Sequence, residues 1–112
     1  MYDYTVRAAF ADPTVAEAWV AWLQDGHVAK VLAVGALSAA IVQLDGHGHG
    51  HGDDDGDDAR YEVRYTFASK AAFEAYEREH APRLRAAGAS RFPPEVAEYS
   101  RSKGAIIWSS PR

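Results

Sequence analysis

The segment from Asp45 to Asp58 contains no apolar side chain, and it separates two strongly patterned halves of the chain. It consists of alternating glycine and histidine followed by aspartates, residue types that are poor in the interiors of helices and strands. A segment of this composition cannot enter a hydrophobic core. We therefore expect one domain over residues 1–112, with a disordered polar hairpin loop at 45–58 within it.

The acidity of the chain is concentrated in this loop. The formal net charge is −4, but six of the sixteen acidic residues lie between Asp45 and Asp58. The rest of the chain has ten acidic residues and twelve lysines and arginines, so the body of the protein is close to neutral. A nucleic-acid partner normally requires a strongly basic face, and we expect none.

Cysteine is absent, which excludes disulfides, thiolate-bound zinc and thiol catalysis. No apolar run approaches the roughly 18 residues that suggest a membrane-spanning helix, so we expect no membrane partner. Residues 1–4 have neither the basic nor the apolar region of a signal peptide. These features predict a cytoplasmic protein.

Alternation of apolar and polar residues with a period of two predicts strands at 2–10 and 60–67. Residues 36–44 are apolar on both sides and predict another strand, while the weaker pattern at 96–102 predicts a fourth. The polar loop joins 36–44 to 60–67, and we expect these two strands to form an antiparallel hairpin.

The first helix has two candidate starts. Asp12 followed by Pro13 combines a capping acceptor with proline at the first helical position. Thr14 and Glu17 offer an alternative capping box one turn further in. Gly26 is expected to end this helix, because glycine is common just beyond the last helical residue.

Further helical segments are expected on both sides of the loop. A short helix is predicted over 27–33, with Gly35 as its end. In the second half, Ser69 is a capping residue, and Pro82 is expected to break the helix because proline removes a backbone hydrogen bond. The short helical turn after the break is expected to end at Gly88.

The resulting order is βαββαβ with an added short helix in each half. Two split β-α-β units of this kind predict an α+β, ferredoxin-like sandwich, with helices on one face of an antiparallel four-stranded sheet. The other face is expected to carry Thr5, Arg7, Glu62, Arg64 and Thr66. It lacks the stacking aromatics of RNA-binding sheets. Pairing with a second copy would give a dimeric α+β barrel.

Four stretches carry a resemblance to a known family: Trp19–Trp22, Val31–Gly35, Tyr61–Tyr65 and Glu79–Arg85. In these residues the chain resembles the domain-of-unknown-function 4286 family, which consists of small bacterial proteins. The resemblance covers nearly the whole chain in order, apart from the 45–58 segment. It implies a ferredoxin-like, dimeric fold and implies no activity.

Five polar residues near predicted helix ends are candidates for a small-molecule pocket between the sheet and the helices, or along the seam of a homodimer. Arginine binds carboxylates and other anions through two parallel hydrogen bonds, and histidine titrates near neutrality. The alternative is surface pairing of the arginines and structural roles for the histidines at helix ends. The candidates are His27, Tyr65, His80, Arg83 and Arg85.

No catalytic signature is present, so the predicted function is a small-ligand-binding or interaction module. Trp19 and Trp22 share one helical face, which favours a core or dimer contact over a ligand cage. One alternative is a cofactor-poor dimeric α+β barrel enzyme that uses a histidine as base.

Another alternative is metal binding by the polar loop. In an extended backbone, His47, His49 and His51 would point to the same side, roughly 7 Å apart. Imidazoles of this kind bind zinc, nickel or copper, but ordering so many glycines costs about 1 kcal/mol or more per residue. The loop also has partial EF-hand spacing, although strands rather than helices flank it. We therefore favour a solvated loop and expect no resident cofactor.

Overall fold

The computed structural model describes residues 1–45 and 58–111. The predicted loop at 45–58, with His47, His49 and His51, lies outside the described residues except for its first and last aspartates. The elements in chain order are β1 (Tyr2–Phe10), α1 (Pro13–Trp22), a π-helical turn η1 (Leu23–His27), α2 (Val28–Ala33), β2 (Ser38–Gln43), β3 (Ala59–Phe67), α3 (Lys70–Glu79), α4 (Ala81–Arg91) and β4 (Glu98–Ala105).

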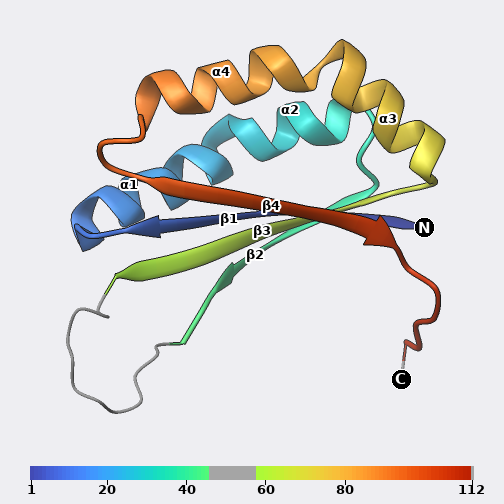
Figure 1. The fold of residues 1–112 in the computed structure, drawn as a ribbon, viewed down its shortest axis with the longest axis horizontal. Helices are drawn as coiled ribbons and strands as arrows, with labels where there is room; N and C mark the ends of the chain where they lie inside the picture. Colours follow the sequence, from blue (N-terminus) through green and yellow to red (C-terminus); the bar gives the residue numbers. More distant parts are fainter. Residues whose placement is uncertain (46–57, 112) are drawn as a thin grey trace.

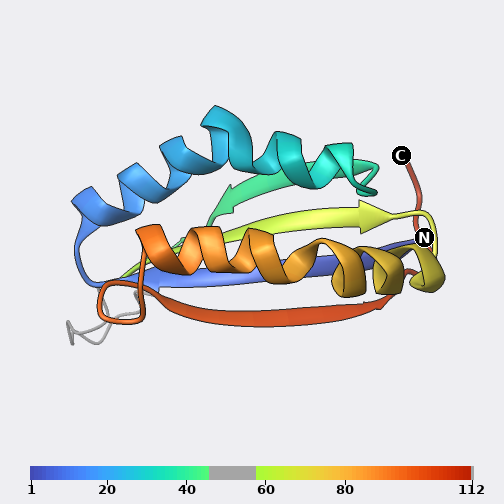
Figure 2. The same ribbon diagram turned by 90° about the horizontal axis from the view of Figure 1, so that it is seen from above.

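The four strands form one antiparallel sheet in the order β2-β3-β1-β4, the order of a ferredoxin-like fold. The helices all lie on one face of this sheet (Figure 1). Seen from above, α1 and α2 form one row and α3 and α4 form a second row beside it (Figure 2). The predicted α+β sandwich and the antiparallel β2–β3 hairpin are both confirmed.

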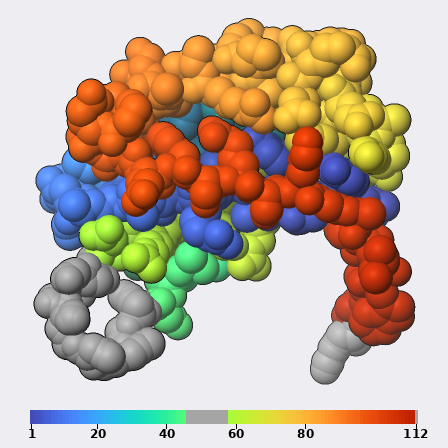
Figure 3. Space-filling view, viewed as in Figure 1, coloured from blue at the N-terminus to red at the C-terminus, as the bar shows by residue number. Residues whose placement is uncertain are grey.

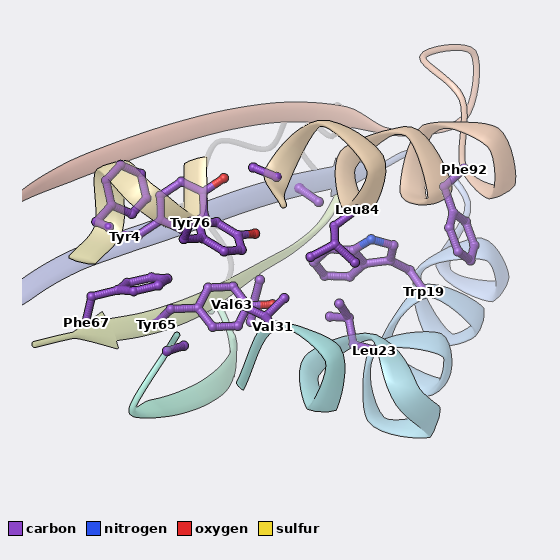
Figure 4. Packing of buried hydrophobic residues seen from close by; sticks show 14 of the residues in the cluster. Tyr4, Trp19, Leu23, Val31, Val63, Tyr65, Phe67, Tyr76, Leu84 and Phe92 are labelled. Carbon is purple, nitrogen blue, oxygen red and sulfur yellow. The ribbon is translucent and has the colours of Figure 1, made fainter. Parts of the chain in front are cut away.

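The core lies between the helices and the inward face of the sheet. Alternate residues of β1 and β3 point toward the helices, as their sequence pattern predicts. The rings of Tyr4 and Phe67 lie 4.9 and 5.3 Å from the ring of Phe73 on α3, measured between ring centroids. Tyr4, Phe67 and Tyr76 lie toward one end of this layer, and Trp19, Leu84 and Phe92 lie toward the opposite end (Figure 4).

Both predicted helix starts at Asp12 and Ser69 are confirmed. The side chain of Asp12 accepts a hydrogen bond from the backbone N–H of Thr14 at 2.9 Å. The capping acceptor of α1 is therefore Asp12 rather than Thr14. Ser69 Oγ accepts from the backbone N–H of Ala72 at 3.0 Å. Such caps satisfy backbone donors that have no partner inside the helix.

The expectation that Gly26 interrupts the first helix, with a short helix after it, is confirmed. Gly26 has non-helical torsion angles at a kink within η1, and α2 begins two residues later at Val28. The N–H of Val28 bonds to the carbonyl of Leu23 across this kink, which gives the π-helical turn. Gly35 ends the helical row as predicted, with a φ of 139° that other residues rarely adopt.

The expectation that Gly88 ends the second helical row is wrong, because α4 continues to Arg91. The reason is a tertiary contact. A Cβ atom at position 88 would lie 3.3 Å from Cη2 of Trp22, so glycine allows α4 to pass close to this indole ring. The predicted break near His80 is confirmed, since α3 ends at Glu79 and α4 starts at Ala81.

Two strand boundaries differ from prediction because turns compete for the same residues. Residues 36–37 precede β2, and the N–H of Ala36 bonds to the carbonyl of Val31 in the helical row. Residues 96–97 precede β4, and their N–H groups bond to the carbonyl of Pro93. Within the described residues, no helix has the length and apolarity needed to cross a membrane.

The sheet face away from the helices carries an ion-paired cluster. Arg7 Nε and Arg64 Nε each donate to the carboxylate of Glu62 at 2.8 Å. Burial would raise the pKa of Glu62, but its hydrogen bonds to the two guanidinium groups lower it below its usual range. Arg7 is therefore paired with Glu62 across the strands and Arg64 is paired with it along β3, and neither arginine lines the cavity described below.

We expect Phe73→Ala to lower the free energy of unfolding by about 3–5 kcal/mol, because the ring is fully buried and its loss leaves a cavity. Urea denaturation measures this change. Phe73→Leu, which retains most of the apolar volume, should lose much less. Equal stability of wild type and Phe73→Ala would show that this ring is not part of the core.

Candidate functional site

A cavity of about 280 Å³ lies between the sheet and the helices. Its lining residues come from β1, β3, β4, α1, η1, α2, α3 and α4, so both helical rows and three of the four strands surround it. The space-filling view shows a hollow between α4 and β4, with blue-green atoms of the first helical row at its bottom (Figure 3). The cavity is therefore open to solvent between these two elements.

Six aromatic side chains form much of the cavity wall. Tryptophans come from α1, and tyrosines come from three strands and from α3. Large rings provide flat apolar area while their N–H and O–H groups stay available for hydrogen bonds. The aromatic lining residues are Tyr4, Trp19, Trp22, Tyr65, Tyr76 and Tyr99.

His27 is held against the wall by an aromatic contact. Its imidazole stacks on the indole of Trp22, with ring centroids 4.2 Å apart and an angle of 22° between the planes. Burial, with a smaller contribution from the charge of Lys30, lowers the pKa of His27 to about 4. The ring is therefore neutral near pH 7 and is not the helix-end cation that one interpretation of the sequence expected.

Arg85 brings a positive charge to the cavity. Its Nη2 atom donates to the Tyr4 hydroxyl at 3.2 Å and to Glu77 Oε2 at 3.4 Å. Burial alone would lower the pKa of Arg85, but these hydrogen bonds raise it, so the guanidinium remains charged. Its Nε atom is buried and has no hydrogen-bond partner among the described residues.

The hydroxyls of Tyr65 and Tyr76 are protonated at neutral pH. Burial is the main cause that raises the pKa of Tyr65 well above its usual range and that of Tyr76 to about 12. Across residues 1–45 and 58–111, neither hydroxyl has a hydrogen-bond partner. Both hydroxyls can therefore donate to a bound molecule.

The structure brings three of the five predicted ligand residues together and leaves two apart. His27, Tyr65 and Arg85 line the cavity. His80 and Arg83 do not line it, and instead contact each other, with Arg83 Nη1 3.0 Å from His80 Nδ1. This pair lies at the junction of α3 and α4.

Sequence reasoning missed several lining residues, of which Arg101 is the most important. Arg101 follows Tyr99 by two residues in β4, so strand alternation places both on the inward face. Its guanidinium lies 5.7 Å from the centroid of the Tyr99 ring. The same alternation, extended beyond the apolar residues, would have identified Arg101 from the sequence.

In the described ranges, no group of three histidine, cysteine, aspartate or glutamate residues is arranged to hold a metal ion. The predicted metal ligands His47, His49 and His51 lie outside those ranges. Metal binding by the loop stays a prediction.

The fold and the cavity define a ferredoxin-like α+β protein with an aromatic-lined, solvent-open internal site. Residues 1–102 match the family model described as "Domain of unknown function (DUF4286)". The chain therefore belongs to this family, and the resemblance found in the sequence is confirmed. No curated protein sequence matches the chain.

Several solved structures share the fold across almost the whole chain. A dimeric ferredoxin-like protein from an uncultured marine organism has a TM-score of 0.72 and 14% identity, with 97% of each chain covered. HapK from Hahella chejuensis has a TM-score of 0.66 and 17% identity, covering 100% of this chain and 98% of HapK. SnoaB, a cofactor-independent oxygenase from Streptomyces nogalater, has a TM-score of 0.58 and 12% identity, with 99% and 98% covered. At these identities the similarity shows the fold alone.

His27 should make stability depend on pH. Its pKa is about 4 in the folded protein and 6.5 ordinarily, so between these values the unfolded chain binds a proton that the folded chain does not. We expect this residue to reduce the free energy of unfolding as pH falls from 6.5 to 4. His27→Gln should lose less stability than wild type over that interval.

Urea denaturation above pH 6.5 and near pH 4 measures this difference, and an NMR titration of the His27 ring measures its pKa directly. Equal pH dependence in both proteins, together with a ring that titrates near 6.5, would contradict the burial argument.

Proposed function

We propose that this protein binds a small organic molecule in the cavity between its sheet and its helices. The observation that carries the proposal is the aromatic-lined cavity of about 280 Å³ with polar groups that converge on it. Small-molecule sites are typically apolar cavities of about 300–1,000 Å³ with a few placed polar groups. The volume of this cavity is just below that range, which favours a compact ligand.

The lining supports binding in two ways. Apolar area that a ligand removes from water contributes about 25 cal/mol per Å². The hydroxyls of Tyr65 and Tyr76 have no partner in the described parts of the chain, so a ligand that accepts from them replaces solvent contacts without breaking protein hydrogen bonds. His27 and Arg85 add a neutral imidazole and a charged donor at the same site.

A second candidate function is a cofactor-poor enzyme with a histidine base. His27 lines the cavity and is neutral at pH 7, as a base must be. SnoaB, which shares the fold, is described as a cofactor-independent oxygenase. A pKa of about 4 makes His27 a weak base, however, so ligand binding is the favoured function. In the enzyme alternative, His27→Gln would abolish turnover of the natural ligand while binding persists.

Metal binding by the polar loop has a separate test, because residues 46–57 lie outside the described part of the chain. If the loop binds metal, deletion of residues 46–57 abolishes nickel or zinc retention while ligand binding in the cavity persists. Retention of metal by the deletion variant would contradict metal binding by the loop.

A cytoplasmic location also stays a prediction from the sequence.

Obstruction of the cavity should abolish ligand binding without unfolding the protein. Ala89 is an exposed residue of α4 that lines the cavity, so Ala89→Trp adds a large side chain at the opening. We expect this variant to weaken binding of 2-naphthamide, a neutral aromatic probe, at least about tenfold. Isothermal titration calorimetry measures the affinity.

Ala87→Trp is the matched control for this experiment. Ala87 is also exposed on α4 but does not line the cavity. Equal loss of binding in both variants would indicate a general effect on α4, and no loss in Ala89→Trp would place the probe elsewhere.

We propose further that the protein forms a homodimer through the sheet face that carries no helix. That face is uncovered, and the C-terminal segment bends to the same side of the sheet (Figure 1). The segment exposes two large apolar residues, Ile107 at 92% and Trp108 at 78%. A second copy would bury them, and two solved structures with this fold are described as dimeric.

The dimer predicts a doubled mass by size-exclusion chromatography with light scattering. Replacement of both apolar tail residues, Ile107→Ser with Trp108→Ser, should shift the equilibrium toward the monomer. Val96→Ser, at another exposed apolar residue, serves as the control and should remain dimeric. A wild-type monomer at all concentrations would refute this proposal, while the cavity proposal would be unaffected.

A further inference from the structure

We infer that the molecule bound in this cavity is an aromatic anion, a planar ring system that carries a carboxylate or a similar anionic oxygen group. The inference rests on the proposed ligand-binding function and adds the chemical class of the ligand. It follows from the charges around the cavity, from the free donor atom of Arg85 and from the shape of the wall.

The charged residues that line the cavity are all cationic. Arg85 on α4 and Arg101 on β4 lie on the two elements that flank the opening, and no aspartate or glutamate lines the cavity. His27 is neutral and does not change this balance. A cavity with apolar walls and unbalanced positive charge attracts anions, because charges interact more strongly where water is partly excluded.

Arg85 has a donor available for such an anion. Its Nη2 atom is engaged by Tyr4 and Glu77, while the buried Nε atom has no partner in the described part of the chain. Glu77 neutralises Arg85 only in part, since its carboxylate also lies 3.7 Å from Nζ of Lys103. An anionic group that enters the cavity beside this guanidinium would supply acceptors that the described part of the protein does not provide.

Arg101 supplies the second charge from the opposite side of the opening. Its side chain is exposed, and it has no ion-pair partner within residues 1–45 and 58–111. Its guanidinium packs over the ring of Tyr99, itself a lining residue. Both guanidinium groups lie close enough to Tyr76 to influence its hydroxyl, so the two charges converge on one part of the cavity.

The wall defines the rest of the ligand. Rings from β1, β3 and β4 face rings from α1 and α3 across the cavity. Flat aromatic compounds stack against such rings or meet them edge-on, which adds about 0.5–1.5 kcal/mol per pair beyond area burial. A cavity of about 280 Å³ suits a compact one- or two-ring compound.

The test compares isosteric probes of different charge. Calorimetry would measure the affinities of 2-naphthoate, an anion, 2-naphthamide, which is neutral, and 2-naphthylmethylamine, a cation. We expect naphthoate to bind at least tenfold more tightly than the amide, with an affinity that falls as salt increases. The amine should bind most weakly.

Arg85→Gln and Arg101→Gln should each weaken naphthoate binding about tenfold and leave naphthamide binding unchanged. Arg83→Gln, on the same helix but outside the cavity, is the matched control. Arg101 is exposed and forms no ion pair among the described residues, so its variant remains informative if loss of the Arg85–Tyr4 hydrogen bond prevents folding.

The outcomes separate this inference from the proposed function. Equal affinity for naphthoate and naphthamide, or naphthoate binding that survives both substitutions, overturns the aromatic-anion inference and leaves a ligand-binding cavity intact. Failure of all three probes to bind the wild-type protein overturns both.

Discussion

The pairing register of β1 with β3 is the constraint on which the rest of this structure depends. Tyr4 lies opposite Tyr65 and Arg7 lies opposite Glu62, so aromatic residues share one face and charged residues the other. A slip of one residue would turn Glu62 toward the helices and an aromatic side chain toward solvent. The Arg7–Glu62 ion pair, seated on the outer face, favours the observed register over that alternative.

Once the aromatic face is fixed, interruptions in the helical rows determine where the cavity lies. Both rows are broken near their middle, the first at η1 and the second at His80 between α3 and α4. Side chains on either side of these breaks line the cavity, together with Gly88 and Ala89 further along α4. A straight helix would place its apolar side chains against the aromatic face of the sheet along its whole length. The kinks in the helical rows instead leave space between the helices and the sheet. The residues near the breaks that line the cavity are Trp22, Leu23, His27, Tyr76, Leu84 and Arg85.

The strands and the helix starts could be predicted because their signals are local. Alternation over residues 2–10 and the capping side chains of Asp12 and Ser69 act within one element. The helix end expected at Gly88 could not be predicted, because the glycine accommodates Trp22, a residue distant in sequence. Glycine is equally suited to ending a helix and to close packing, and the sequence alone does not distinguish these roles.

The candidate site shows the same division between local and distant information. His80, Arg83 and Arg85 are neighbours in sequence, yet residues two positions apart point to different sides of a helix. Arg85 instead shares its side with Leu84 and Gly88, at the spacing that defines the apolar face of α4. An arginine within an apolar helical stripe must bring its charge close to the core, where it needs an acceptor. The position of an arginine within an apolar face, rather than the clustering of basic residues in sequence, therefore indicates a functional side chain. Arg101 has such a position too, because strand alternation places it on the inward face of β4 beside Tyr99.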